Sequence, residues 1–509
     1  MTLIKKLFRL VGCVVALVLG LASHGVVRTC GAAPLADVYK VEDIAFPDGV
    51  PPEVGGLDFD ANGMLYVALR RGDIIVARPQ SDPAGFEWRL FATGFHNGCG
   101  LVASEPGRVL VSQMAELTEA TDTDGDGRAD RYRTVADEWG LSGNYHETNA
   151  LCGDGRGGYF LAIGTASYNG PTFVYTKGVY SPTGRRGRNF SAVKYRGWTL
   201  HLRADGRMEP YASGFRVNNG LTVDDEGNLW SADNQGDWKA ATPFYHIRKD
   251  RFYGHPSSLV WDERWPEDKD PLATFRNDLA AYNRHRTPAA VQIPHRELVR
   301  SGAEPLQLPR DGRFGPFGGQ FLLPDIAGER FSRIMVEKVG GEYQGAATLW
   351  MDGFGLRRGG NRLRLGPDGR SIYIGQSVRG WGQPSEGLQR ITWRGGVPFT
   401  IETMHITRSG FRLVFTAPLG PAAAEQESYR VRSMVYQPRW TYGSAPEDVR
   451  DEPLDRAKML NEREVELTLR TMAPGRVYHL ELGETVQSTG NETPAYRDFY
   501  YTANRLPAR

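Results

Sequence analysis

Residues 216–238 read RVNNGLTVDDEGNLWSADNQGDW, and this stretch contains a clear copy of the pattern from which the fold is predicted. Two short apolar runs, 217–223 and 229–232, flank the turn DDEGN. Because glycine tolerates positive φ and aspartate hydrogen-bonds its own backbone, the pattern predicts a β-hairpin. The second strand leads into the polar cluster Asp233-Asn234-Gln235-Gly236-Asp237, which is therefore expected at a strand end.

The same pattern occurs five times along the chain, at irregular spacing, and a sixth, degenerate copy covers residues 318–336. The clear copies are 56–67 (GLDFDANGMLYV), 100–112, 149–164, 219–233 and 361–375. Such repetition predicts an all-β fold in which each copy is the inner hairpin of one blade of a six-bladed β-propeller. A large β-sandwich with chance turns is the alternative. In a propeller the inner strands surround one channel, so residues beside them meet in space.

The repeat also predicts the domain organisation. We expect a propeller over residues 34–398, with an insertion at 255–313 that lacks the repeat and is rich in Arg, Asp, Pro and Trp. A long insertion of this kind usually covers one face of a propeller, and a disordered loop is the alternative. Residues 399–509 show alternating strands, which favour a small β-sandwich of the immunoglobulin or fibronectin III type.

The first 33 residues have the layout of a secretory signal peptide. Lys5, Lys6 and Arg9 precede an apolar run, and small residues follow it. We therefore expect a secreted or periplasmic protein with no integral membrane span after cleavage. Export permits a disulfide between Cys99 and Cys152, but two buried free thiols fit the sequence equally well.

Composition excludes some classes of partner. The 509 residues contain 61 Lys and Arg against 60 Asp and Glu, a formal net charge of +1. No global field therefore favours nucleic acid or a membrane surface. The absence of a CxxCH motif leaves covalent c-type haem unsupported.

Asp122, Asp124, Asp126 and Asp130 form the sharpest local motif, DTDGDGRAD. Carboxylates at alternate positions with a glycine at the sixth position reproduce the front of a calcium-binding loop. Arg133 stands where such loops carry their last glutamate. The motif predicts a structural calcium in blade two, and a solvated acidic turn is the alternative.

Several polar residues lie directly beside predicted inner strands. His146, in GNYHETN, precedes the inner strand of blade three, where a general base for channel chemistry would have to lie. His96 has a similar place before blade two. Arginine and asparagine residues beside blades four and six suit a polyanionic cofactor or a sugar, since arginine binds carboxylates in pairs of hydrogen bonds. Hydrogen bonding between blades is the alternative role for this group, which comprises Arg216, Asn218, Asn219, Arg357, Arg358, Asn361, Gln376 and Arg379.

The segments ASGFRVNNGLTVDDEGNLWSADNQGDW, FYGHP, EPLQLPRDGRFGPFGGQF and GGNRLRLGPDGRSIYIGQSVRGWG, with the ending FYYTANRLP, together carry a resemblance. The chain resembles secreted sugar-dehydrogenase-like propellers of the planctomycete type, which are distant relatives of pyrroloquinoline quinone (PQQ)-dependent glucose and sorbosone dehydrogenases. The resemblance implies His146 as catalytic base, Arg216 among the cofactor-binding residues, and calcium beside the quinone. The context HETN after His146 departs from the pattern of those enzymes.

Three functions follow as hypotheses. The first is a sugar dehydrogenase with PQQ and calcium, in which Arg216, Asn219, Arg357 and Arg379 bind the cofactor and an external acceptor takes the electrons. The second is a propeller that binds a carbohydrate or a protein without turnover. The third is a calcium-dependent lactonase or other hydrolase with Asn219 and Asp233 as ligands. A propeller channel can host all three, so fold alone does not decide between them.

Overall fold

The computed structural model describes residues 35–114, 116–141, 150–166, 175–179, 189–378 and 385–508. The predicted signal peptide, His146 and Arg379 lie outside these residues. Within them, none of the helices combines the length and the apolar content needed to cross a membrane.

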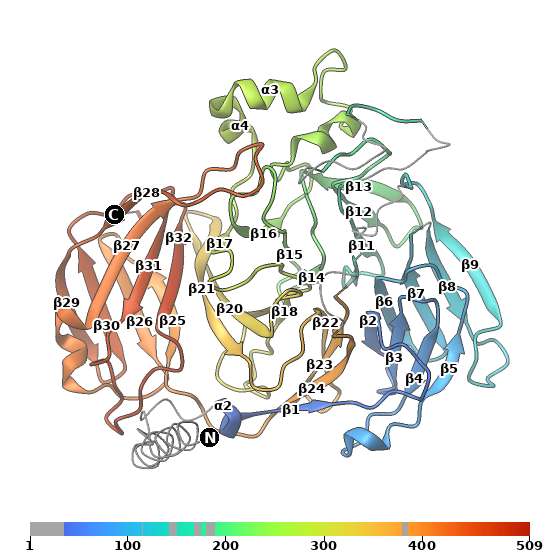
Figure 1. Ribbon diagram of the computed structural model, residues 1–509, viewed down its shortest axis with the longest axis horizontal. Coiled ribbons are helices and arrows are strands. Elements are labelled where there is room, and N and C mark those ends of the chain that lie inside the picture. Colours follow the sequence, from blue (N-terminus) through green and yellow to red (C-terminus); the bar gives the residue numbers. More distant parts are fainter. Residues whose placement is uncertain are drawn as a thin grey trace, which may run out of the picture.

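Six four-stranded antiparallel blades stand around a common axis and form a β-propeller (Figure 1). Five of the blades are separate sheets, and the fifth blade is one half of an eight-stranded sheet. In the first five blades the first strand lies innermost and the sequence neighbours pair in order, whereas the sixth blade takes its outermost strand from the start of the propeller sequence. The first three blades are β2 (Val54–Phe59), β3 (Leu65–Leu69), β4 (Ile74–Ala77) and β5 (Arg89–Ala92); β6 (Gly100–Glu105), β7 (Arg108–Ser112), β8 (Leu117–Thr121) and β9 (Arg131–Ala136); and β10 (Ala150–Gly153), β11 (Tyr159–Ile163), β12 (Trp198–Leu202) and β13 (Met208–Ser213).

The last blade is built from both ends of the propeller sequence. Strand β1 (Tyr39–Asp43) pairs with β24 and completes the sheet of β22 and β23, which closes the ring. The remaining strands are β14 (Thr222–Val223), β15 (Leu229–Ala232), β16 (Thr242–Ile247) and β17 (Val291–Ile293) in blade four; β18 (Leu306–Gln307), β19 (Phe321–Pro324), β20 (Arg330–Val339) and β21 (Glu342–Asp352) in blade five; and β22 (Gly360–Leu365), β23 (Ser371–Gln376) and β24 (Gly387–Trp393) in blade six.

The repeated turns share one local mechanism. In blade four, Asp224 Oδ1 accepts the backbone N–H groups of Glu226 at 3.0 Å and Asn228 at 2.7 Å, and Gly227 takes a φ of 81°. Aspartates at the matching positions of three other blades make the corresponding bonds, namely Asp60, Asp154 and Asp368. The turn is therefore fixed by residues that are adjacent in sequence, which is why the repeat could be recognised.

Blade five shows where the repeat pattern was wrong. The copy at 318–336 is not its inner hairpin, because it forms β19 and β20, the second and third strands. The inner strand is β18, which has only two residues and lies within the segment 255–313 assigned to the insertion. Residues 308–320 separate β18 from β19, whereas the inner hairpin of blade four has the short turn 224–228, so the repeat pattern is not present here.

Apolar side chains pack between the blades. Trp230 on β15 is fully buried, stacks on Phe244 at a ring distance of 5.1 Å, and lies 5.2 Å from Phe321 of blade five. Its indole N–H donates to Asp224 at 2.8 Å. The aromatic centre of the repeat thus joins two blades, and burial of the large ring is favourable because its polar atom has a partner.

The chain after β24 forms two further sheets that enclose one apolar core. One sheet has the order β25-β26-β30-β29 and the other β32-β31-β27-β28, an arrangement that matches the ABED and GFC sheets of immunoglobulin constant-type domains with one added strand. The strands are β25 (Ile401–Ile406), β26 (Gly410–Phe415), β27 (Tyr429–Val435), β28 (Glu447–Asp451), β29 (Leu454–Asn461), β30 (Glu464–Leu469), β31 (Arg476–Leu482) and β32 (Asp498–Ala503).

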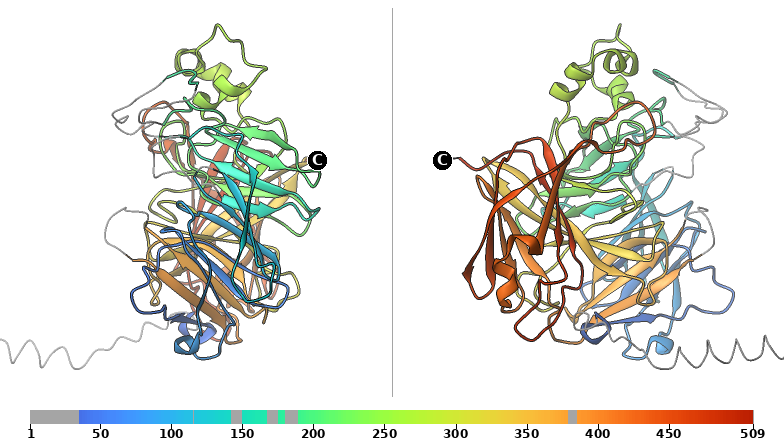
Figure 2. Two further views of the ribbon diagram at one scale, coloured as in Figure 1. Left: turned by 90° about the vertical axis from the view of Figure 1, so that its right-hand side faces the viewer. Right: turned by 60° about the vertical axis from the view of Figure 1, so that its left-hand side comes forward.

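This sandwich is fused to the propeller by strand pairing. Strand β32 pairs with β21, the outermost strand of blade five, through Gly345–Thr502, Ala346–Tyr501 and Ala347–Tyr500. The result is one continuous eight-stranded sheet. The sandwich therefore lies beside blade five rather than over the channel (Figures 1 and 2).

The insertion in blade four contains the 3₁₀ helix η2 (Pro256–Trp261) and helices α3 (Pro271–Asn277) and α4 (Leu279–His285). We call residues 256–285 the rim insertion, because it projects from the outer edge of blades three and four instead of covering a face (Figures 1 and 2). Asp270 and Asp278 cap the two helices with their side chains. The other short helices are α2 (Leu35–Val38), η1 (Pro83–Gly85), η3 (Pro421–Ala424) and η4 (Gln426–Ser428).

Candidate functional site

The propeller axis is occupied by an arginine side chain. Arg362, on inner strand β22, is 2% exposed. Its Nε donates to the carbonyl of Cys99 at 2.8 Å, and its Nη1 donates to the carbonyl of Asn219 at 2.5 Å. These carbonyls precede the inner strands of blades two and four, so one guanidinium of blade six links three blades across the axis.

Acidic groups complete this axis network. Glu304, which precedes the inner strand of blade five, pairs with Arg364 and lies 3.5 Å from Arg362 Nε. Arg364 Nε also donates to Asp58 of blade one at 3.0 Å. Burial raises the pKa of Glu304, although both arginines oppose this effect. Two arginines and two carboxylates therefore pair with one another at the axis.

Asn219, a predicted cofactor residue, belongs to the same network. Its Nδ2 donates to Asn361 Oδ1 at 2.8 Å, and both residues are buried. The next residue, Gly220, packs directly on the backbone of Glu304, because an added Cβ would lie 2.0 Å from the Glu304 Cα. The motif NNGL thus serves the contact between blades four and five.

Arg216, the residue with the clearest predicted role, forms a buried ion pair. Its Nε donates to Asp237 Oδ1 at 2.8 Å, and the residue is 5% exposed. Asp237 Oδ2 also accepts the backbone N–H of Asn189 at 2.7 Å and lies 3.3 Å from His255 Nε2. Burial lowers the pKa of His255, although Asp237 opposes this effect. Asp237 therefore joins blade four to the long blade-three connection and to the rim insertion.

The sandwich covers this ion pair with the loop between β27 and β28. The ring of Tyr442 lies 5.2 Å from the Arg216 guanidinium carbon. The backbone N–H of Trp238 donates to the Arg439 carbonyl at 2.6 Å, and that of Gly443 donates to the Gly236 carbonyl at 2.9 Å. No sequence signal indicated this contact, because loop residues of a second domain carry no periodicity that points to their partner.

Asp233, the proposed ligand of a hydrolytic calcium, already has four partners. Its Oδ1 accepts the N–H groups of Val217 and Asn234, and its Oδ2 accepts the N–H of Arg216 and contacts Lys239 Nζ at 3.0 Å. Burial lowers the pKa of Lys239, although Asp233 opposes this effect. Metal binding by Asp233 would require these bonds to break.

Arg357, also predicted to bind a cofactor, points toward the outer part of blade six. Its Nε donates at 2.8 Å to Asp43 on the outermost strand β1. Quinone carboxylates need free cationic partners, and the two predicted arginines in the described part, Arg216 and Arg357, are both already ion-paired. The described residues of this predicted set therefore do not fit PQQ as they stand. His146 and Arg379 lie outside the described residues.

The acidic motif lies at the end of blade two where the inner strand β6 ends, opposite the end where β6 begins. Oxygen atoms of Asp122, Asp124 and Asp126 lie within 4.8 Å of one another in the loop between β8 and β9. The N–H of Asp122 donates to the carbonyl of Gly107, in the turn between β6 and β7. Asp130 instead accepts the N–H and hydroxyl of Thr123. The structure brings three of the four predicted ligands together and leaves Asp130 out of the cluster.

Cys99 and Cys152 are both buried free thiols, which decides between the two alternatives that the sequence left open. Burial raises the pKa of the Cys152 thiol. Because the thiolate is the reactive form, Cys152 is unreactive in this setting.

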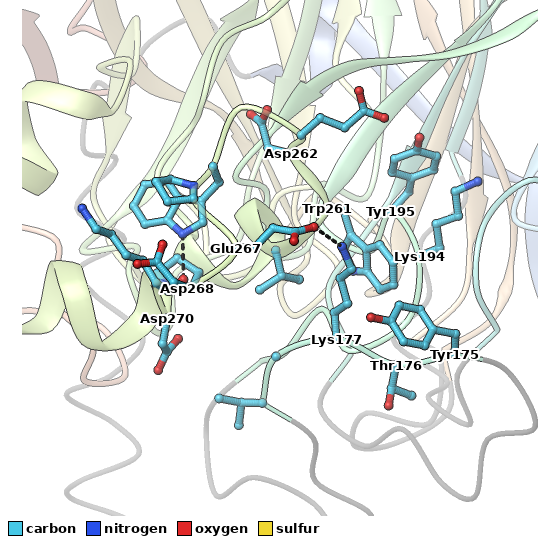
Figure 3. A pocket seen from close by; sticks show the side chains of 18 residues that line it. Tyr175, Thr176, Lys177, Lys194, Tyr195, Trp261, Asp262, Glu267, Asp268 and Asp270 are labelled. Atoms are coloured by element: carbon cyan, nitrogen blue, oxygen red, sulfur yellow. Dashed lines mark hydrogen bonds and ion pairs between the residues drawn. The ribbon is translucent and has the colours of Figure 1, made fainter.

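A pocket of about 880 Å³ lies between the rim insertion and the connection from β11 to β12 (Figure 3). We call it the rim pocket, and all its lining residues come from these two segments. They include four aromatic residues, five carboxylates and three lysines: Tyr175, Tyr195, Trp261 and Trp265; Asp262, Glu263, Glu267, Asp268 and Asp270; Lys177, Lys194 and Lys269. The volume lies within the range of small-molecule sites.

Two tryptophans fix the wall of this pocket. The indole N–H of Trp261 donates to the Ser191 carbonyl at 2.6 Å, and that of Trp198 donates to the Ser258 carbonyl at 2.9 Å. Across the pocket, Lys177 Nζ lies 5.6 Å from the centre of the Trp261 ring and 4.0 Å from Glu267 (Figure 3). Tyr175 is 71% exposed and stands edge-on to Trp261.

The sequence did not predict this pocket. Residues 261–271 (WDERWPEDKDP), in the insertion that was expected to cover one face, supply one wall. The other wall, with Tyr175, Lys177 and Tyr195, comes from an irregular connection of blade three that carried no signal.

A family model described as a domain of unknown function (DUF7133) matches residues 82–288. No curated protein matches the chain. Among solved structures, the chain is similar to the holo PQQ domain of pyranose dehydrogenase from Coprinopsis cinerea, with 13% identity, a TM-score of 0.48, and coverage of 70% of this chain and 95% of that chain.

Two further solved structures are similar at the same level. A Trichoderma reesei carbohydrate-active enzyme of family AA12 has 11% identity, a TM-score of 0.49, and coverage of 70% and 96%. A glucose dehydrogenase has 16% identity, a TM-score of 0.47, and coverage of 70% and 100%. At these identities and scores the likeness does not extend to activity or ligand.

Proposed function

We propose that this protein binds a carbohydrate in the rim pocket. The observation that carries the proposal is the combination of four aromatic residues with carboxylates and lysines around one cavity of about 880 Å³. Sugars combine apolar C–H faces with hydroxyl groups, so they need both kinds of partner. In the described part of the propeller axis, by contrast, Arg362 and Arg364 are already paired with Glu304 and Asp58.

Both walls of the rim pocket supply an apolar ring and a charged group. The exposed ring of Tyr175 and the ring of Trp261 offer apolar surface for the face of a sugar ring. Glu267 and Asp268 can accept hydrogen bonds from hydroxyl groups, and Lys177 can donate to ring or hydroxyl oxygens. Because the Glu267 side chain is 93% exposed, it would orient the sugar without burying it.

The test is calorimetric titration of the full chain with neutral mono- and oligosaccharides. Tyr175→Ala and Glu267→Gln should each weaken binding about tenfold, as expected for the loss of about 1.4 kcal/mol of interaction. Tyr132→Ala is the matched control, because Tyr132 is an exposed tyrosine on the outer strand β9 of blade two. Equal affinity of Tyr175→Ala and Tyr132→Ala, or no binding by the unaltered protein, would overturn the proposal.

Oxidation of the sugar with PQQ and calcium is the finer proposal, and its support is the sequence resemblance. When bound, PQQ would supply the hydride acceptor for the carbon that bears the oxidised sugar hydroxyl, whose proton would pass to a base. Arg216 and Arg357 are already ion-paired, so neither offers a free cation to the quinone carboxylates. Reconstitution with PQQ and calcium, followed by dye reduction with aldoses, separates this activity from binding: turnover that disappears in His146→Ala supports it, and binding without turnover rejects it.

Location is a separate proposal. The layout of residues 1–33 supports export, which would place the rim pocket in contact with carbohydrates outside the cytoplasm. Sequencing the amino terminus of the protein recovered from its native host tests it, since cleavage near residue 33 is expected.

A further inference from the structure

A second pocket, of about 420 Å³, lies where the propeller meets the sandwich. We call it the junction pocket. It is formed by the end of the rim insertion, the outer part of blade four, strand β21 of blade five, and strands β31 and β32 with the residues that follow. Six arginines line it, against a single carboxylate, that of Glu342: Arg248, Arg251, Arg284, Arg286, Arg476 and Arg505.

Among the described residues, two of the six arginines have a carboxylate partner. Arg248 Nη2 lies 3.0 Å from Glu342, and Arg476 Nη1 lies 2.7 Å from Asp448, which is outside the pocket. Arg286 donates to the Asn283 amide oxygen and Arg505 to the Gly340 carbonyl, which are neutral groups.

Arg251 and Arg284 are the most available of the set. Both are exposed, and neither side chain has a hydrogen bond or ion pair with any residue in the described part of the chain. The Nε atom of Arg248 is buried and has no hydrogen-bond partner. Donor groups in the pocket therefore outnumber the acceptors that the protein supplies.

Like charges that share a small space repel one another, and the repulsion is stronger where protein walls exclude water. Arginine guanidinium groups form paired hydrogen bonds with phosphate, sulfate and carboxylate oxygens. The pocket volume falls in the range of small organic ligands rather than of a single ion. An anionic molecule that carries several such groups would neutralise the repulsion, accept the paired hydrogen bonds and fill the pocket volume.

We propose that the junction pocket binds a small polyanion with two or more phosphate, sulfate or carboxylate groups. The ligand contacts Arg251 and Arg284 from the propeller and Arg505 from the segment after β32, so it bridges the two domains. This site is separate from the rim pocket and is independent of the carbohydrate proposed there.

The experiment uses the full chain and three probes of different anion type: inositol hexakisphosphate, sucrose octasulfate and trigalacturonate. Titration calorimetry at low salt should show binding of at least one probe, with an affinity that falls as ionic strength rises. The probe that binds most tightly identifies the anion type. Thermal unfolding in the presence of that probe should occur at a higher temperature, since the ligand binds the folded state.

The variant Arg251→Ala/Arg284→Ala should weaken binding about a hundredfold, because two charge-assisted contacts are lost. Both side chains are exposed and lack partners, so the variant should fold normally. Arg394→Ala is the matched control, because Arg394 is an exposed arginine elsewhere on the propeller and should leave the affinity unchanged. Binding of no probe, or equal affinity in the double variant and the control, would overturn the proposal.

Discussion

The axis network and the junction pocket are both rich in arginine, yet they differ in every other respect. At the axis, Arg362 and Arg364 are buried and bonded to Glu304, Asp58 and backbone carbonyls. In the junction pocket, Arg251 and Arg284 are exposed and have no partner among the described residues. The number of arginines at a site therefore says little about its role. Whether the protein already supplies the counter-charge separates a structural site from a candidate binding site.

The largest effect is expected when the arginine at the axis is removed, which tests whether the axis network is structural. Arg362→Ala should lower the free energy of unfolding by about 3–5 kcal/mol, because Glu304 loses one of its two cationic neighbours and carbonyls of blades two and four lose their donor. Urea denaturation measures the change. Arg394→Ala should stay within about 0.5 kcal/mol of the unaltered protein, and a similar small effect for Arg362→Ala would show that the axis is not a structural centre.

His246 tests the electrostatics near the junction pocket, because it lies on β16 beside the pocket residue Arg248. Burial, with a smaller contribution from Arg248, lowers the pKa of His246 from 6.5 to about 4. Between these two values the unfolded chain takes up a proton that the folded protein does not, so this histidine destabilises the fold as pH decreases from about 6.5 to 4. Stability should therefore fall less between pH 7 and pH 5 in His246→Gln than in the unaltered protein.

Urea denaturation at the two pH values gives this difference directly. The carboxylates contribute equally to both proteins, so only the difference between the two slopes reports on His246. Identical slopes would mean that His246 titrates alike in the folded and unfolded chains.

The smallest expected effect concerns the acidic loop of blade two, which is peripheral to both arginine sites. Calcium should raise the melting temperature by about 2 °C, since it binds only the folded loop, and EDTA should reverse the change. Asp122→Asn should abolish the response, whereas Asp130→Asn should retain it because Asp130 bonds to Thr123 instead of joining the other three carboxylates. The same melting temperature with and without calcium would show that the motif is a solvated acidic turn and not a calcium site.

The blades in which an aspartate fixes the turn through nearby backbone groups could be predicted from the sequence. The aspartates at positions 60, 154, 224 and 368 bond to backbone groups only two to four residues away, so the pattern is complete within a short segment. The acidic loop was predictable for the same reason. The sandwich was also visible, because alternation along a strand records which face is buried.

Tertiary structure alone decided the sites. The partner of Arg362 at the axis is 263 residues away, and Arg216 lies under a tyrosine of the second domain. Strand β18 is joined to β19 by the long connection 308–320 instead of the short turn of the repeat. The two pockets are assembled from segments that no periodicity connects. Hydrogen bonds within a turn are specified by residues that are neighbours in the chain. Charge pairs and pocket walls depend instead on which blades and domains are in contact. These contacts form only when the ring of blades closes and the sandwich packs against it.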